Sequence, residues 1–154
     1  MSRISPSSSI RSTVLVTEAT GSCGTVSCFE LLKSKLGHGI EVHAAVHATS
    51  PKIGDEQWKR QFASVRPIDA EDPTSLDFRG IDCLFIIPSN DESRVSQVIN
   101  YVDTAKRYNV GHILLLSLIG AEARNTLFSR QFREMEVRPV SGHCWFYSGF
   151  FLFW

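Results

Sequence analysis

The fold of this chain is decided by residues 13–24, which read TVLVTEATGSCG. A short run of β-branched and apolar residues ends at a turn, and apolar residues then recur at helical spacing over residues 25–36. A strand that ends in a glycine-containing turn and opens a helix is typical of dinucleotide-binding folds. These residues therefore predict a strand, a phosphate-binding turn and the start of a helix.

The turn has the spacing of a Gly-x-x-Gly-x-x-Gly motif whose first glycine is replaced. Gly21 and Gly24 hold the second and third positions, and Glu18 holds the first. The second glycine lets the backbone approach a pyrophosphate, and the third allows close packing of the helix on the strand. A glutamate does not suit the tight first position, so we expect weakened nucleotide binding. The candidate cofactor contacts of this stretch are Thr17, Thr20, Gly21, Ser22, Cys23 and Gly24.

Strand-like and helix-like segments alternate along the rest of the chain. Further strands are predicted at residues 40–46, 64–68, 81–87 and 112–116, and further helices at 51–62, 95–105 and 127–137. This alternation predicts an α/β fold with a doubly wound, Rossmann-like parallel sheet in the order 3-2-1-4-5. Residues 145–154 form a candidate sixth strand. Residues 1–12 form a Ser-rich tail that we expect to be disordered, and residues 13–154 form one NAD(P)-binding domain.

Composition narrows the function classes. The chain has 154 residues and a formal net charge of +0, so no bulk field attracts nucleic acid or an anionic membrane. No apolar run is long enough to span a bilayer, and we expect a cytoplasmic protein, with the nucleus and the mitochondrion as alternatives. The four cysteines include no Cys-x-x-Cys pair, so we expect no metal site.

The remaining candidate cofactor contacts follow the predicted strands. Ligands of doubly wound sheets bind at the carboxyl ends of the strands, near the switch between the first and fourth strands. No acid ends the second strand to accept ribose hydroxyls, which favours NADP over NAD. The residues at or just after the carboxyl ends of the predicted strands are His47, Lys52, Asp69, Ala70, Pro88, Ser89 and Ser117.

The sequence resembles the NmrA-like branch of the atypical short-chain dehydrogenase/reductases. The resemblance rests on residues 14–24, on RVSQVINYVDTAKRYNVGHILLLS at 94–117, on FSRQFREME at 128–136, and on Ser141-Gly142 followed by Trp145 and residues 149–151. It implies that His47 stands where the family often has the arginine that holds the 2′-phosphate of NADP, and Lys52 can supply part of the missing charge. It also places Asp69 near the adenine, although Asp69 can equally cap the following turn.

The catalytic residues of the classical enzymes are absent. No tyrosine is followed by a lysine four residues on, so the proton-donating Tyr-x-x-x-Lys pair is missing. The lysine of the resembled family would fall near Arg130 or Gln131, and neither can do its acid–base work. Ser117 has no partner base in the sequence, and we assign no catalytic residue. Family members also continue into a lobe that closes over the nicotinamide, so we expect a domain that is shortened at its C-terminus.

Two classes of function agree with these features. The first is a regulatory or redox-sensing protein whose NAD(P)(H) occupancy changes its affinity for a protein partner. The alternative is an NADPH-dependent oxidoreductase of a small carbonyl or quinone, and a third reading is an inactive shortened chain. NADP is the expected cofactor and NAD the second candidate. The apolar run at residues 145–154 predicts self-association or contact with a protein partner.

Overall fold

The computed structural model describes residues 12–34, 39–123 and 125–136, and the backbone of residues 143–148. Six strands form one sheet, and every neighbouring pair is parallel. The expected tail lies almost wholly outside the described residues, as do residues 149–154 of the apolar C-terminal run. The strands are β1 Ser12–Val16, β2 Ile40–His47, β3 Ser64–Ile68, β4 Cys83–Ile86, β5 His112–Ser117 and β6 His143–Ser148.

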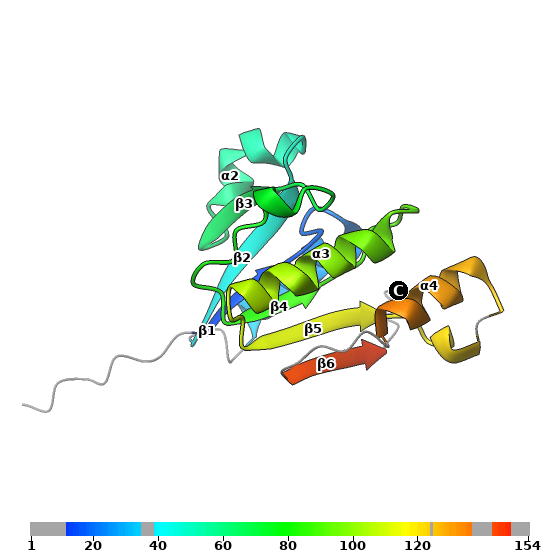
Figure 1. Ribbon diagram of the computed structural model, residues 1–154. Helices are drawn as coiled ribbons and strands as arrows, with labels where there is room; N and C mark the ends of the chain where they lie inside the picture. The colour runs from blue at the N-terminus through cyan, green and yellow to red at the C-terminus, as the bar shows by residue number, and fades with distance from the viewer. Residues whose placement is uncertain (1–11, 35–38, 124, 137–142, 149–154) are drawn as a thin grey trace, which may run out of the picture.

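The strand order is β3-β2-β1-β4-β5-β6, which confirms the predicted order and adds a sixth strand at the edge. β1 lies between β2 and β4, so the sheet changes direction beside it. In Figure 1 the strands point to the right, and their carboxyl ends form one edge of the molecule. This edge is where doubly wound sheets bind their ligands.

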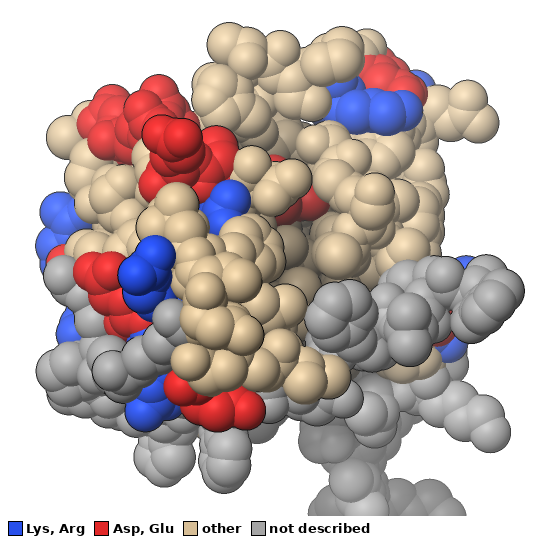
Figure 2. All heavy atoms as spheres, turned by 90° about the vertical axis from the view of Figure 1, so that its right-hand side faces the viewer, with Lys and Arg blue, Asp and Glu red and all other residues tan. Residues whose placement is uncertain are grey.

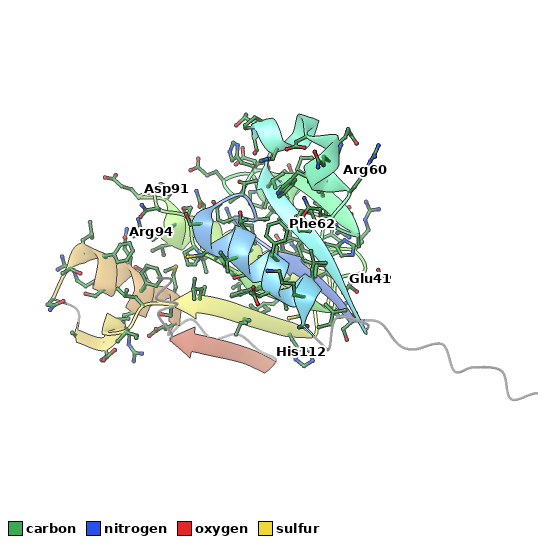
Figure 3. The ribbon with its side chains drawn as sticks, turned by 180° about the vertical axis from the view of Figure 1, so that it is seen from behind. Glu41, Arg60, Phe62, Asp91, Arg94 and His112 are labelled. Atoms are coloured by element: carbon green, nitrogen blue, oxygen red, sulfur yellow. The ribbon has the colours of Figure 1, made fainter. Side chains whose placement is uncertain are left out.

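Helices cover both faces of the sheet, as Figures 1 and 3 show from opposite sides. The alternation along β1 explains this, because Val14 and Val16 pack with Cys28 of α1 whereas Leu15 packs with Val98 of α3. Apolar side chains buried on both faces are typical of a parallel sheet. The long helices are α1 Ser22–Lys33, α3 Arg94–Arg107 and α4 Leu127–Glu136.

The helix predicted at residues 51–62 is broken in two. The structure has a 3₁₀ turn, η2, at Pro51–Gly54 and a short helix, α2, at Glu56–Lys59. Asp55 causes the break, because its backbone is extended and its carboxylate accepts the Trp58 N–H at 2.9 Å as a helix cap. Trp58 is buried, and its ring centroid lies 4.7 Å from that of Phe62.

Two boundaries near the carboxyl edge also differ from the prediction. α1 begins at Ser22, three residues early, because Gly21 already serves as its N-cap. β4 ends at Ile86 because the buried Thr17 hydroxyl binds both backbone groups of Ile87, accepting from N–H at 2.8 Å and donating to C=O at 3.1 Å. Among the helices of the described ranges, none is both long and apolar enough to cross a membrane.

Candidate functional site

The turn after β1 holds a glutamate in a left-handed backbone conformation. Glu18 has φ 51°, and its carbonyl accepts the N–H of Gly21 at 2.9 Å. Left-handed conformations cost a residue with a Cβ about 1–2 kcal/mol. The unusual conformation expected at the first glycine position is therefore present, with a charged residue in it.

Gly24 packs directly against this turn. A Cβ built on Gly24 would lie 1.9 Å from the Glu18 carbonyl oxygen, 2.5 Å from the Glu18 carbonyl carbon and 2.9 Å from the Ala19 Cα. The Thr25 hydroxyl adds a hydrogen bond of 3.0 Å to the Ala19 carbonyl. The third glycine thus has the role expected of it, because only glycine lets α1 approach the turn so closely.

The N-terminus of α1 is open. Gly21 is the N-cap and has no side chain to cap the helix, and Thr20, Ser22 and Cys23 are all exposed. The first amide groups of a helix lack acceptors within the helix and carry its positive dipole end. An uncapped, exposed helix start of this kind can hold a phosphate.

A cavity of about 490 Å³ lies beside this turn, at the ends of β1, β2, β3 and β4. Its floor is apolar, since Ala45, Ile68, Ala70 and Tyr101 all belong to the core between the sheet and α3. Burial raises the pKa of Tyr101. The volume is in the range of small-molecule pockets. Among the predicted contacts, those that line the cavity are His47, Asp69, Ala70 and Ser89.

Four carboxylates line the cavity, those of Glu18, Asp69, Glu71 and Asp91. Figure 2 looks onto the edge where the strands end, and acidic side chains crowd its upper left, next to a central hollow. Most of them already accept hydrogen bonds: Asp69 from the Glu71 N–H at 2.9 Å, Asp91 from the Ser93 N–H at 2.9 Å, and Glu71 from the Ser93 hydroxyl at 2.7 Å. Asp69 therefore caps its own turn while it also lines the cavity.

Glu18 differs from the other carboxylates. Within the part of the chain that the structure describes, its carboxylate accepts no hydrogen bond. Burial raises its pKa, the nearby Asp91 raises it further, and His47 opposes both effects. His47 itself is oriented by Thr49, whose hydroxyl lies 2.8 Å from its Nδ1.

Several other predicted contacts have partners of their own. The Thr17 hydroxyl is buried and bound to Ile87, and Lys52 forms an ion pair of 2.8 Å with Asp55 instead of lining the cavity. Pro88 follows β4 beside Ser89 without lining the cavity. Ser117 is buried at the end of β5, and its hydroxyl donates to Glu136 of α4.

Two charged residues of this edge were missed by the sequence reasoning. Glu136 binds Ser117 and also pairs with Arg133 at 3.3 Å, three residues earlier on α4. Arg94 starts α3 and is 6% exposed, with its guanidinium 4.4 Å from the ring centre of Phe128 and no hydrogen-bond partner for Nε or Nη1 among the described residues. Figure 3 labels it beside Asp91, at the same end of α3. The i,i+3 spacing of Arg133 and Glu136 was visible in the sequence, whereas the burial of Arg94 gave no signal there.

The chain matches no protein-family model and no curated protein. It is similar in structure to the NADPH-dependent quinone oxidoreductase of Escherichia coli complexed with NADPH, with a TM-score of 0.69 and 25% identity over 80% of this chain. It is also similar to the triphenylmethane reductase of Citrobacter sp., with a TM-score of 0.67 and 26% identity over 80% of this chain. That reductase has also been solved complexed with NADP(H).

A nucleoside-diphosphate-sugar epimerase of Staphylococcus aureus is similar to the same extent, with a TM-score of 0.67 and 26% identity over 80% of this chain. The chain spans less than half the length of each of these proteins. It covers 43% of the quinone oxidoreductase, 43% of the triphenylmethane reductase and 44% of the epimerase. The similar part is the Rossmann-like half, whose carboxyl edge carries the open helix and the cavity.

Proposed function

Because its structural neighbours are NAD(P)-binding, NmrA-like, atypical short-chain dehydrogenase/reductases, as the sequence resemblance predicted, we propose that this chain binds NAD(P)(H) along the carboxyl edge of its sheet. We further propose that the bound dinucleotide serves a regulatory or redox-sensing function. The observation that carries the proposal is the close packing of Gly24 on the Glu18 turn beside an uncapped helix start. A turn packed in this way presents backbone amides to a pyrophosphate.

The cavity suits the adenosine end of such a ligand. The pyrophosphate would lie against the amides at Ser22 and Cys23, since the Gly21 amide already donates to the Glu18 carbonyl, and the adenine against the apolar residues Ala45, Ile68 and Ala70. When bound, the dinucleotide supplies a centre that accepts or gives a hydride. The residues of this chain bind and orient it.

Glu18 makes this binding weak. Its carboxylate faces the site, and one such charge about 5 Å from a phosphate costs roughly 3 kcal/mol at an effective dielectric of about 20, as an upper figure. Since about 1.4 kcal/mol corresponds to a tenfold change, this repulsion weakens binding by up to about two powers of ten. A weakly held dinucleotide suits a sensor, because its occupancy follows its concentration.

The regulatory function is favoured over catalysis by the missing Tyr-x-x-x-Lys pair. One observation supports the alternative of an NADPH-dependent oxidoreductase. Ser117 ends β5, and its hydroxyl donates to Glu136, so it has the carboxylate partner that the sequence did not reveal. In the reduction of a carbonyl, the Ser117 hydroxyl would give its proton to the substrate oxygen and regain one from the carboxyl group of Glu136. This pair would act on a small carbonyl or quinone.

Titration calorimetry with NADP, NADPH, NAD and NADH tests the proposal. We expect saturable binding of at least one of them at micromolar to millimolar concentration. A Gly21→Asp variant, which places a carboxylate at the helix start, should lose it. Hydride transfer from NADPH to a quinone dye would favour the oxidoreductase, whereas a protein partner captured only in the presence of nucleotide would favour the sensor. No binding of any of the four would overturn the proposal.

A further inference from the structure

Dinucleotide folds commonly place an acid at the end of the second strand, where it accepts the ribose hydroxyls of NAD. Here β2 ends at His47, and no acid follows it before Asp55. The structure brings an acid to this corner from a different strand. Glu18 lies in the turn after β1, lines the same cavity as His47, and is near enough to it for their charges to interact.

Glu18 is also the carboxylate of this cavity that accepts no hydrogen bond from the described residues. Asp69, Glu71 and Asp91 hold the loops after β3 and β4 through hydrogen bonds to Ser93 and to the Glu71 amide. The Glu18 carboxylate accepts none from the described residues. A half-buried acceptor in a pocket is stabilised by a ligand that donates to it, because an unpaired polar group in a buried site is costly.

A 2′-phosphate is poorly matched to this corner. Lys52, the cation nearest in sequence to the end of β2, is held by Asp55 at 2.8 Å and does not line the cavity. The cavity lining contains a single imidazole against four carboxylates, those of Glu18, Asp69, Glu71 and Asp91. A dianionic phosphate placed there would meet like charges, whereas a diol would meet an acceptor.

We propose that Glu18 is a specificity residue of the proposed nucleotide site, accepting the 2′- and 3′-hydroxyls of the adenosine ribose and excluding a 2′-phosphate. The site therefore prefers NAD(H) to NADP(H), although the sequence of β2 alone favours the phosphorylated form. This assignment rests on the proposed function. It also explains why a glutamate is kept in a left-handed conformation, since strained backbone conformations occur mostly at functional sites.

The test is the ratio of the dissociation constants of NADP and NAD, measured by calorimetry on the full chain. Wild-type protein should bind NAD at least about tenfold more tightly than NADP, a difference of about 1.4 kcal/mol. Glu18→Gln keeps the shape and removes the charge, so it should tighten NADP about tenfold more than it tightens NAD and bring the two dissociation constants close to each other. Glu18→Asn, which tolerates the left-handed conformation but is too short to reach the ribose, should bind the two nucleotides equally.

Glu71→Gln is the matched control, because it removes one charge from the same cavity at a carboxylate that is already hydrogen-bonded. It should change the ratio by less than about threefold. A wild-type preference for NADP, an unchanged ratio in Glu18→Gln, or an equal change in Glu71→Gln would each overturn the assignment while leaving the nucleotide site intact. Absence of binding by all variants would overturn the proposed function and the assignment together.

Discussion

Gly24→Ala tests the packing on which the nucleotide turn depends. The added Cβ would lie 1.9 Å from the Glu18 carbonyl oxygen, and its three nearest atoms all belong to backbone. No side-chain rotation can relieve this clash, so α1 and the turn must separate by about 1 Å, and overpacking of this kind costs up to about 3 kcal/mol. In a chain of 154 residues, each kcal/mol lowers the midpoint of thermal unfolding by about 2–4 °C. We therefore expect a loss of about 6–12 °C, measured by circular dichroism.

The matched control is Gly54→Ala, where an added Cβ meets nothing within 4 Å. This variant should stay within about 0.5 kcal/mol of wild type. Gly21→Ala should fall between the two, because its Cβ would lie 3.3 Å from the Glu18 carbonyl oxygen. If Gly24→Ala unfolds at the same temperature as Gly54→Ala, the helix does not pack on the turn as described, and the argument for a phosphate-binding turn fails.

Three further outcomes follow from buried polar groups. Burial, and then the charge of Arg66, lower the pKa of His43, so the stability that its neutral form contributes is complete above about pH 6.5 and is lost as the pH falls through the folded-state pKa. Urea unfolding between about pH 7 and 5 should therefore show the wild type losing stability relative to His43→Leu, and the same pH dependence of stability in both proteins would contradict this. Ser117→Ala should lower the free energy of unfolding, measured with urea, by about 1–2 kcal/mol, because it removes the hydrogen bond to Glu136, whose side chain is 15% exposed. A loss below about 0.5 kcal/mol would show that this bond does not stabilise the fold. Arg94→Met keeps an apolar side chain of similar length beside Phe128 and removes buried nitrogens that have no partner among the described residues. The free energy of unfolding in urea should therefore stay unchanged or rise by about 1 kcal/mol, and a clear loss would mean that the guanidinium has a partner.

The sheet could be predicted from the sequence because its signals are local and repeated. Apolar strands alternate with helical periodicity, and right-handed crossovers then leave few ways to order the strands. The Gly24 contact could be anticipated because a three-residue glycine spacing has one geometric reason at the start of a helix. A sixth strand was only a candidate, at residues 145–154, and the strand that pairs with β5 is His143–Ser148.

Side-chain partners at the carboxyl edge could not be predicted in the same way. Lys52 looked available for a phosphate, but Asp55 holds it and also breaks the expected helix at this point. Glu18 was expected only to obstruct, because the sequence does not show that its turn faces His47 across a cavity. Ser117 and Glu136 are 19 residues apart, and only the packing of α4 brings them together. Such pairings depend on tertiary structure and leave no periodic signal.

We propose that the carboxyl edge of the sheet binds an adenine dinucleotide. Backbone amide chemical shifts, recorded while NAD is added to isotopically labelled protein, test it most directly. We expect the shift changes to concentrate at residues 18–24, 69–71 and 89–91, whereas the amides of Thr13, Asp82 and Gly111, at the opposite ends of the strands, should not shift. Shifts confined to any other surface, or none at saturating nucleotide, would contradict it.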